Sequence, residues 1–391
     1  MTDFDPYTLA ARFGAGESDA RPVAPPLYQT STFWSPDPDE FLEMATKPRH
    51  TGFYTRYGNP TVRLFEDAVA QLEGAEAAMA FASGMGATTG AVLSLAAGGH
   101  VVAQSSLYAG VTALLRNIAP RFGIAVDVFE QTDVDAFAAA LKPQTKLVVL
   151  ESPANPLLGV TDIASIAAIA KANGEAIVMV DNTIATPINQ RPLALGADLV
   201  MHSATKALGG HADLLGGVLA GSEALIERIW HTAYLFGAVM DPFAAWLAVR
   251  GLRTLPMRTA RHNATALAVA ERLERHPRIA AAHYPGLRSH PQHNLAASQL
   301  SPGAGCLLSF EVAGGLAAAE TVLANMHVPH RSASFGSFSS LVVHPAAMWA
   351  ASMSEAEQIA AGVVPGLIRL GVGFEEPDLI ADDIEQALAK L

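Results

Sequence analysis

Apolar runs of strand length alternate with helical stretches along much of the chain, and this alternation restricts the possible folds more than any other feature. The runs are nearly continuous in apolar residues, which is typical of strands covered on both faces. Strands separated by helices favour a mainly parallel sheet with helices on both sides. The expected strands cover residues 77–82, 100–104, 124–129, 147–151, 176–181 and 199–202. The sequence therefore predicts an α/β fold that binds its ligand at the carboxyl ends of the strands.

The length of 391 residues predicts two domains and an arm rather than one small core. Residues 1–56 contain many prolines, threonines, serines and aromatic residues but little periodicity, which indicates an extended N-terminal arm. An arm of this composition should be ordered by packing, and a neighbouring subunit is the expected contact. Residues 57–240 form the predicted large domain, and residues 241–391 form a smaller C-terminal α/β domain.

The net charge and the cysteine content limit which binding partners and which cellular compartment we expect. The formal net charge of -12 argues against a nucleic-acid or phospholipid partner. Cys306 is the sole cysteine, which excludes an internal disulfide and fits a reducing compartment. Its apolar neighbours favour a buried, inert thiol. The sequence opens without a basic and apolar leader, and no uncharged apolar run is long enough to span a bilayer. We therefore expect a cytoplasmic protein without a membrane segment.

A loop rich in histidine raises the question of a metal site. His283, His290 and His293 lie close together in the sequence, with Pro285 and Pro291 between them. Metal sites need clustered ligands, and no carboxylates or thiolates accompany these histidines. We therefore expect a surface loop and no bound metal.

One lysine occupies a position that is unusual for a surface residue. Lys206 follows the predicted strand 199–202 and the polar residues Ser203 and Thr205, with a glycine-rich segment after it. Asp181 ends another apolar strand upstream. A solvated lysine and a helix-capping aspartate are the alternative interpretation. Together, however, they suit pyridoxal phosphate (PLP), with the lysine bonded to the cofactor, the acid on the pyridinium nitrogen and the hydroxyls on the phosphate.

Further motifs follow the order of a known family. They are Tyr54-Thr55-Arg56, Asn59-Pro60-Thr61, Ser83-Gly84-Met85, Tyr108, Glu151-Ser152-Pro153-Ala154-Asn155-Pro156, Tyr284-Pro285-Gly286-Leu287 and Arg369-Leu370-Gly371-Val372-Gly373. With the segments around Asp181 and Lys206, the chain resembles the family of cystathionine γ-synthase, cystathionine γ-lyase and methionine γ-lyase, the Cys/Met-metabolism branch of PLP enzymes. The resemblance covers nearly the whole chain. It implies an aminotransferase-like fold of type I, with PLP as the cofactor.

Two segments are candidates for binding the cofactor phosphate. Ser83-Gly84-Met85 joins a predicted strand to a helix, and the free N–H groups at a helix start can bind an anion. A plain strand-to-helix turn is the commoner explanation of such a motif by itself. The resemblance also implies that Tyr54 and Arg56 reach the cofactor phosphate of a neighbouring subunit. Arginine binds phosphate through two donors, and tyrosine adds a hydroxyl. The implied assembly is a homotetramer built from two dimers.

Four more residues are candidates for contacting the cofactor or an amino-acid substrate. Tyr108 opens a helix after a strand, so its ring could stack on the cofactor or pack beneath a loop. Asn155 lies in a proline turn, and the resemblance implies a bond to the cofactor's phenolic oxygen. Arg369 lies within an apolar strand, where a charge needs a partner, either a substrate carboxylate or a structural ion pair. Ser334 begins the segment that the resemblance identifies as the substrate loop.

The resemblance implies a PLP-dependent lyase or transferase that acts by γ-elimination or γ-replacement on a small amino-acid substrate. Lys206 would move protons at Cα and Cβ, and Tyr108 would help to protonate the leaving group. A β-lyase or an aminotransferase on the same fold remains open, as does a protein that binds PLP without catalysis. A hydride-transfer enzyme is disfavoured, because no G-x-G-x-x-G follows the first strand with an acid about twenty residues on.

Departures from the family pattern concern the pocket for the γ-substituent. Phe335 and Ser339 stand where leucine and glutamate are common, and Ala333 replaces an acidic residue of cystathionine γ-lyases. Gly110 stands where methionine γ-lyases carry a cysteine. Neither lyase subtype is well matched, and the pocket is less acidic than one for a cystathionine tail. We therefore expect a homoserine or homocysteine derivative as the substrate.

Overall fold

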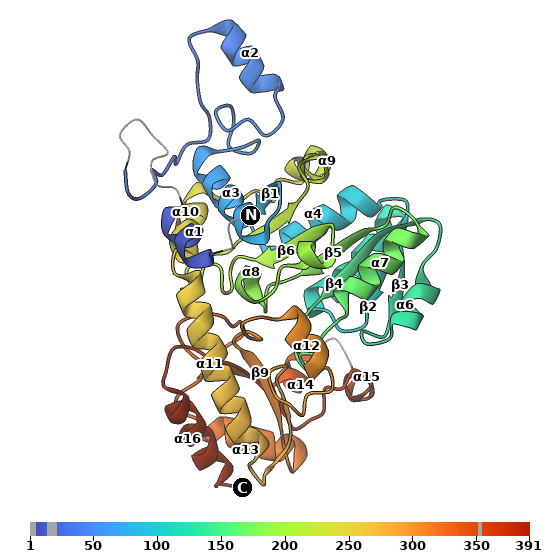
Figure 1. Ribbon diagram of the computed structural model, residues 1–391, viewed down its shortest axis with the longest axis vertical. Helices are drawn as coiled ribbons and strands as arrows, with labels where there is room; N and C mark the ends of the chain where they lie inside the picture. Colours follow the sequence, from blue (N-terminus) through green and yellow to red (C-terminus); the bar gives the residue numbers. More distant parts are fainter. Residues whose placement is uncertain (1–4, 14–21, 351–353) are drawn as a thin grey trace.

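Two β-sheets with their covering helices form the body of the protein, and an N-terminal segment projects from one end of it (Figure 1). The computed structural model describes residues 5–13, 22–350 and 354–391. Within these ranges no helix has both the length and the apolar character needed to cross a membrane.

The larger sheet has seven strands in the order β1-β7-β6-β5-β4-β2-β3. In that order they are Ala77–Phe81, Gly217–Gly221, Leu199–Ser203, Ile177–Asp181, Thr145–Glu151, His100–Gln104 and Ala125–Phe129. Strands β6, β5, β4, β2 and β3 run parallel, and β7 is antiparallel to both β6 and β1. All six predicted strands are confirmed, with small differences at their ends. The sequence analysis missed β7, which begins at Gly217 inside the glycine-rich segment that follows Lys206.

Helices cover both faces of this sheet, which explains the continuous apolar runs. Successive strand residues point to opposite faces, so Val101 and Leu147 pack with one set of helices while Val102 and Val148 pack with another. The first face is covered by α4 (Gly84–Ala96) and α9 (Glu223–Ala233). The second is covered by α6 (Val134–Ala140) and α7 (Ile163–Asn173), and, over β1 and β7, by α3 (Pro60–Glu73) and α10 (Pro242–Leu252).

The smaller sheet has five strands in the order β10-β11-β12-β9-β8. In that order they are His330–Arg331, Leu341–Val343, Leu367–Gly371, Leu307–Val312 and Ile279–His283. Helices α13 (Gly315–Asn325), α16 (Pro377–Leu388) and the long α11 (Leu255–Glu274) pack against it. Arg369 lies in the central strand β12, and Cys306 is a buried free thiol just before β9, both as predicted.

Shorter helical segments connect these elements. They are α5 (Ala109–Ala113), a π-helix (Leu114–Ile118), α8 (Thr186–Asn189), α12 (His293–Gln299), α14 (Pro345–Trp349), α15 (Glu355–Ala360) and the 3-10 turns Ala119–Phe122, Pro192–Leu195 and Tyr234–Phe236.

Helix α11 links the two halves of the molecule. Its first residue, Leu255, packs with α3 and α10 in the core of the larger sheet, while Val269 and Leu273 pack in the core of the smaller sheet. Figure 1 shows this helix running from α10 down to α16. The boundary after residue 240 stays a prediction, and α10, which follows it, packs with the larger sheet.

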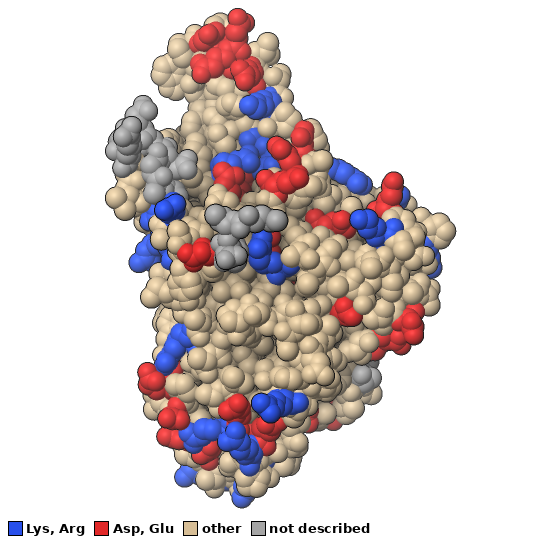
Figure 2. Space-filling model, viewed as in Figure 1, with Lys and Arg blue, Asp and Glu red and all other residues tan. Residues whose placement is uncertain are grey.

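The N-terminal segment contains two short helices, which differ from the expected extended arm. Helix α1 (Pro6–Arg12) packs Ala10 into the core beside α3, and α2 (Pro38–Thr46) stands away from the body (Figure 1). Each begins with an aspartate cap followed by proline, a start signal that hydrophobic periodicity does not reveal. Acidic side chains gather on the projecting end (Figure 2), where Trp34 is 82% exposed. Residues 1–4 and 14–21 of the predicted arm lie outside the described residues, and contact with another subunit stays a prediction.

Candidate active site

A cavity of about 290 Å³ lies at the carboxyl ends of the parallel strands, between the two sheets. Strands β4, β5 and β6 end there in Glu151, Asp181 and Ser203, and β12 of the smaller sheet contributes Arg369. Eleven of the thirteen predicted site residues line it, namely Ser83, Gly84, Met85, Tyr108, Asn155, Asp181, Ser203, Thr205, Lys206, Ser334 and Arg369. The strand-end argument from sequence therefore brings these side chains together.

Lys206 lies in the turn after β6 and points at the loop that begins with Ser334. Its Nζ donates a hydrogen bond to the hydroxyl of Ser334 at 2.7 Å and lies 5.3 Å from the ring centroid of Phe335. Burial lowers the pKa of the Lys206 amine, and the nearby guanidinium of Arg369 lowers it further. A lowered pKa makes it easier for the amine to lose its proton, as a base requires.

Asp181 is held in place by Thr183. Its Oδ1 accepts hydrogen bonds from the Thr183 hydroxyl at 2.5 Å and from the Thr183 N–H at 3.0 Å. The same hydroxyl accepts the N–H of Ser203 at 2.9 Å, which ties the ends of β5 and β6 together. Burial raises the pKa of Asp181, while the two bonds from Thr183 lower it. The carboxylate is thus oriented before any cation reaches it.

The turn at Ser83 and Gly84 forms a close-fitting anion cradle. Ser83 caps α4 by accepting the N–H of Gly86 at 3.0 Å, and the turn packs tightly on the neighbouring strands. A Cβ at Gly84 would lie 3.0 Å from the Cβ of Ser203, and one at Gly217 would lie 2.2 Å from the carbonyl oxygen of Ser83. Only glycine fits at Gly217, so the start of a helix of 13 residues is brought up to the cavity wall.

Arg369 is a buried cation with a spare donor. Its NH1 donates to the side-chain oxygen of Asn155 at 3.1 Å, and its NH2 donates to the carbonyl oxygen of Ser334 at 3.2 Å. Its Nε is buried and has no partner among the described residues. Burial lowers the pKa of this guanidinium to about 10, still well above neutral. Both partners are neutral oxygens, so the charge is available for a carboxylate.

Tyr108 stands at the mouth of the cavity with half of its surface exposed. A Cβ on Gly110 would lie 2.6 Å from the Tyr108 ring and 2.9 Å from the sulfur of Met85. A cysteine at position 110 would therefore require the Tyr108 ring or the Met85 side chain to shift.

Glu151 also lines this cavity, although the sequence analysis named it only as part of a motif and not as a site residue. One carboxylate oxygen accepts the N–H of Tyr108 at 2.6 Å, and the other accepts the N–H of Asn155 at 3.0 Å. Burial raises its pKa to about 8, and the neighbouring carboxylate of Asp181 adds to this shift. The signal was present in the sequence, because the apolar strand 147–150 ends in an acid in the same way as the strand that ends in Asp181.

Tyr54 and Arg56 do not line this cavity. The guanidinium of Arg56 lies over the rings of Tyr54, Tyr57 and Tyr234, at 5.4, 5.2 and 5.3 Å from their centroids. Contact with the cofactor of a neighbouring subunit therefore stays a prediction for both residues.

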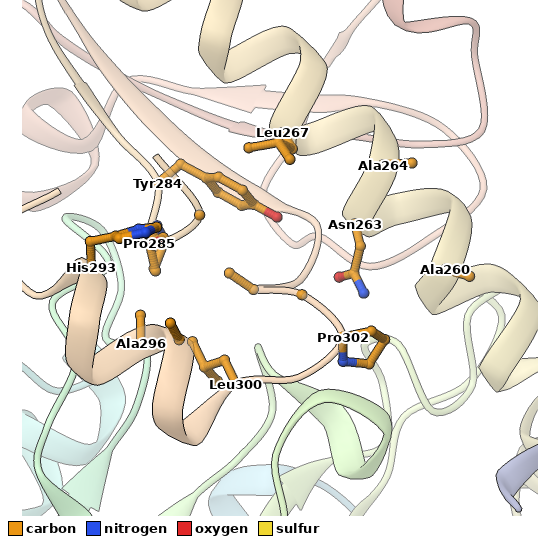
Figure 3. A pocket seen from close by; sticks show the side chains of 14 residues that line it. Ala260, Asn263, Ala264, Leu267, Tyr284, Pro285, His293, Ala296, Leu300 and Pro302 are labelled. Atoms are coloured by element: carbon orange, nitrogen blue, oxygen red, sulfur yellow. Dashed lines mark hydrogen bonds between the residues drawn. The ribbon is translucent and has the colours of Figure 1, made fainter. Parts of the chain in front are cut away.

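A second cavity, of about 460 Å³, lies between α11, α12 and the turn at Pro285 (Figure 3). Its polar side chains already have partners. Asn263 exchanges hydrogen bonds with Asn189 at 3.0 and 2.8 Å, and the Tyr284 hydroxyl donates to the Gly305 carbonyl at 3.0 Å. His293 also lines the cavity, and its Nδ1 lies 3.4 Å from the Pro285 carbonyl oxygen. The rest of the lining is mostly alanine, glycine and proline.

The residues of the first cavity fit pyridoxal phosphate. Lys206 offers the amine for its aldehyde, and Asp181 offers the acid for its ring nitrogen. The cradle at Ser83, with the hydroxyls of Ser203 and Thr205, offers the donors for its phosphate. A mainly parallel sheet with a lysine, an acid and an anion cradle at its carboxyl edge defines a PLP enzyme of fold type I.

Comparison with known proteins identifies the family. The family model described as Cys/Met metabolism PLP-dependent enzyme matches residues 7–389. L-methionine gamma-lyase of Pseudomonas putida is 42% identical over 94% of this chain and 92% of its own length. L-methionine gamma-lyase of Porphyromonas gingivalis is 40% identical over 98% of this chain and 97% of its own. Cystathionine gamma-synthase 1 of Nicotiana tabacum is 39% identical over 94% of this chain and 68% of its own. The chain belongs to the Cys/Met metabolism PLP-dependent enzyme family.

Proposed function

We propose that this protein is a PLP-dependent lyase that catalyses γ-elimination on an amino acid with an uncharged γ-substituent, with γ-replacement when a thiol is present. One observation carries the proposal. The Ser334 hydroxyl accepts a hydrogen bond from the Lys206 amine, and the Ser334 carbonyl oxygen accepts one from the Arg369 guanidinium. One residue thus holds the amine and the proposed carboxylate anchor close together. An α-carboxylate bound at Arg369 would thus bring the α-carbon of the substrate close to Lys206.

The lining of the cavity supports an uncharged γ-substituent. Beyond Lys206 the wall includes Val111, Leu215, Phe335 and Met348, which are all apolar. A charged substituent would lose its hydration there without gaining a partner, whereas a thioether or a short ester would not. The similarity to methionine gamma-lyases and cystathionine gamma-synthases supports the same substrate class.

The side chains have distinct proposed roles. Bound pyridoxal phosphate supplies the chemistry of electron withdrawal from the substrate's α-carbon. Arg369 and Asn155 hold the α-carboxylate, and Lys206 removes the proton from Cα. Once Lys206 has given up that proton, it is free to remove the proton from Cβ. Tyr108, at the mouth, protonates the departing γ-substituent.

The assembly and the compartment are further parts of the proposal. We propose a homotetramer of two dimers, in which Tyr54 and Arg56 bind the phosphate in the neighbouring subunit's site. Both residues lie outside their own chain's cavity, and an arm with Trp34 largely exposed supports such a contact. The cytoplasm is the proposed compartment, because the one thiol is buried and reduced.

Turnover assays with identified products test the proposed reaction. The PLP-loaded enzyme is incubated with L-methionine, O-acetylhomoserine, O-succinylhomoserine and cystathionine, each with and without cysteine. We expect 2-oxobutyrate from methionine or O-acetylhomoserine without cysteine, and less from the two substrates with charged substituents. Pyruvate would instead indicate β-elimination, a transferred amino group would indicate an aminotransferase, and a thioether formed at the expense of 2-oxobutyrate would indicate a synthase. No turnover with any substrate would refute the proposal.

A further inference from the structure

The carboxylate of Glu151 joins two loops of the active site. Its side chain reaches the cavity from the end of β4, and the residue is 5% exposed. One oxygen accepts the N–H of Tyr108, which follows β2, at 2.6 Å. The other accepts the N–H of Asn155, which follows β4, at 3.0 Å. One side chain thus fixes the backbone at the proposed proton donor and at a proposed substrate ligand.

Each of these two contacts has a consequence beyond the loop it holds. Tyr108 precedes the short helix α5, and no side chain caps that helix, so the bond to Glu151 fixes its start. The side-chain oxygen of Asn155 accepts a hydrogen bond from Arg369 at 3.1 Å. Glu151 therefore supports the orientation of Arg369 through Asn155, and the orientation of the Tyr108 ring through the Tyr108 backbone.

An acid at this position works against folding stability. Glu151 pairs with Asp181 across strands β4 and β5, so two carboxyl groups lie side by side in the interior. Burying a carboxylate beside another is costly, and burial and Asp181 together raise the pKa of Glu151. A glutamine could never become charged and would avoid this cost, but it has only one side-chain oxygen and could accept from only one of the two loops. The costly placement points to a role in function rather than in stability.

We propose that Glu151 is a positioning residue that fixes Tyr108 and Asn155 relative to Lys206 through one shared carboxylate. The inference deepens the proposed function and rests on the roles given there to Tyr108 and Asn155. Glu151 moves no proton to or from the substrate in this proposal. It acts through the two backbone N–H groups that it holds.

A matched control is available within the chain. Glu66 is also a buried glutamate, and its Oε1 accepts the backbone N–H of Ala80 at 2.9 Å. It does not line the active-site cavity. Glu66→Gln and Glu151→Gln both remove a buried acid that accepts a backbone N–H. Only Glu151→Gln changes a contact with the loops of the site.

Amide hydrogen exchange on the full chain, with and without PLP, tests the proposal together with steady-state kinetics. In Glu151→Ala we expect exchange at Tyr108 and Asn155 to quicken about tenfold, because each N–H loses its acceptor. Glu151→Gln keeps one acceptor, so only one of the two segments should quicken. The value of kcat should fall about a hundredfold in Glu151→Ala, because Tyr108 loses its orientation. Glu66→Gln should change neither the exchange of the two segments nor kcat.

Three outcomes would overturn the proposal. The first is unchanged exchange of both segments in Glu151→Ala, and the second is faster exchange over the whole chain, which would indicate a purely structural role. The third is a loss of kcat in Glu66→Gln equal to that in Glu151→Gln. The exchange measurement needs no substrate, so it distinguishes failure of this inference from failure of the proposed reaction, which the turnover panel reports on the unmodified enzyme.

Discussion

At the scale of single residues, the ring of Phe335 lies near both cations of the site. It is 5.3 Å from Lys206 Nζ and 5.9 Å from the Arg369 guanidinium carbon. An aromatic ring at this distance stabilises a cation by about 0.5–2 kcal/mol, whereas leucine offers only an apolar surface. Phe335 therefore offsets part of the lowering of the Lys206 pKa that burial causes.

Replacing Phe335 should change the acidity of Lys206. In Phe335→Leu the cationic amine loses the ring, so its pKa should fall. The pH dependence of Lys206 acylation in the cofactor-free protein, followed by mass spectrometry, measures this shift. Phe335→Tyr keeps the ring and should leave the profile unchanged. A profile that is the same in all three proteins would contradict the prediction.

Arg369→Lys should weaken substrate binding more than it slows turnover. A lysine keeps the charge but lacks the planar fork that contacts Asn155, Ser334 and a carboxylate together. We expect KM for the amino acid to rise about a hundredfold, a cost of the size found for a buried charge-assisted hydrogen bond, with a smaller change in kcat. Arg272→Lys, in the ion-pair cluster between α11 and α16, should leave both values unchanged. An equal effect of the two replacements would refute the assignment.

The raised pKa of Glu151 makes stability depend on pH in a definite direction. Its pKa rises from 4.5 in the unfolded chain to about 8 in the folded one, so the folded state holds the proton more tightly. The stability that this proton gives is complete below pH 4.5 and is lost as the pH rises through 8. The cofactor-free protein should therefore lose more thermal stability between pH 6 and pH 9 than Glu151→Gln does. Equal losses in melting temperature would show that Glu151 does not titrate in this range.

At the scale of elements, the approach of β7 to the turn before α4 sets the shape of the anion cradle. In Gly217→Ala the new methyl group would lie 2.2 Å from the Ser83 carbonyl oxygen and force the turn away from the strand. We expect the Kd for PLP, measured by equilibrium dialysis, to rise at least about tenfold, since a displaced helix start loses its donors. In Gly86→Ala the methyl group meets the Cβ of Ala238 at 3.4 Å, an ordinary contact, so the affinity should be kept. A Gly217→Ala protein with unchanged affinity would exclude the cradle as the phosphate site.

Most elements around the site could be predicted from sequence because their signals are local. The continuous apolar strands, and the acid and the lysine at the ends of two of them, placed Asp181 and Lys206 correctly at one edge of the sheet. Strand β7 was missed, because Gly-Val-Leu-Ala-Gly has small residues that local patterns attribute to turns. The contacts of Glu151 depend on loops that are distant in sequence, and no periodicity encodes them. Helices α1 and α2 were missed because they are short and their start signals are capping residues.

At the scale of the whole molecule, we expect the N-terminal arm of one subunit to complete the active-site cavity of a neighbouring subunit. If Arg56 serves a neighbour's site, then Lys206→Ala and Arg56→Ala damage the same site from opposite chains. Each variant expressed alone should have little activity. A mixed dimer of the two should regain activity, because one of its sites receives an intact Lys206 and an intact Arg56. Mixed assemblies are purified with two different tags and assayed, and no gain over either parent would refute sharing of the site.

The active site draws on two separately packed cores. Lys206, Asp181 and the anion cradle belong to the larger sheet, while Arg369 and Phe335 come from the smaller one. The residues proposed to hold the cofactor thus lie in a different core from many of the residues proposed to select the substrate. Mutations in the smaller core can alter the choice of substrate while the chemical machinery is inherited intact. This division gives natural selection, or a protein engineer, a region in which new specificities can be explored at little risk to catalysis.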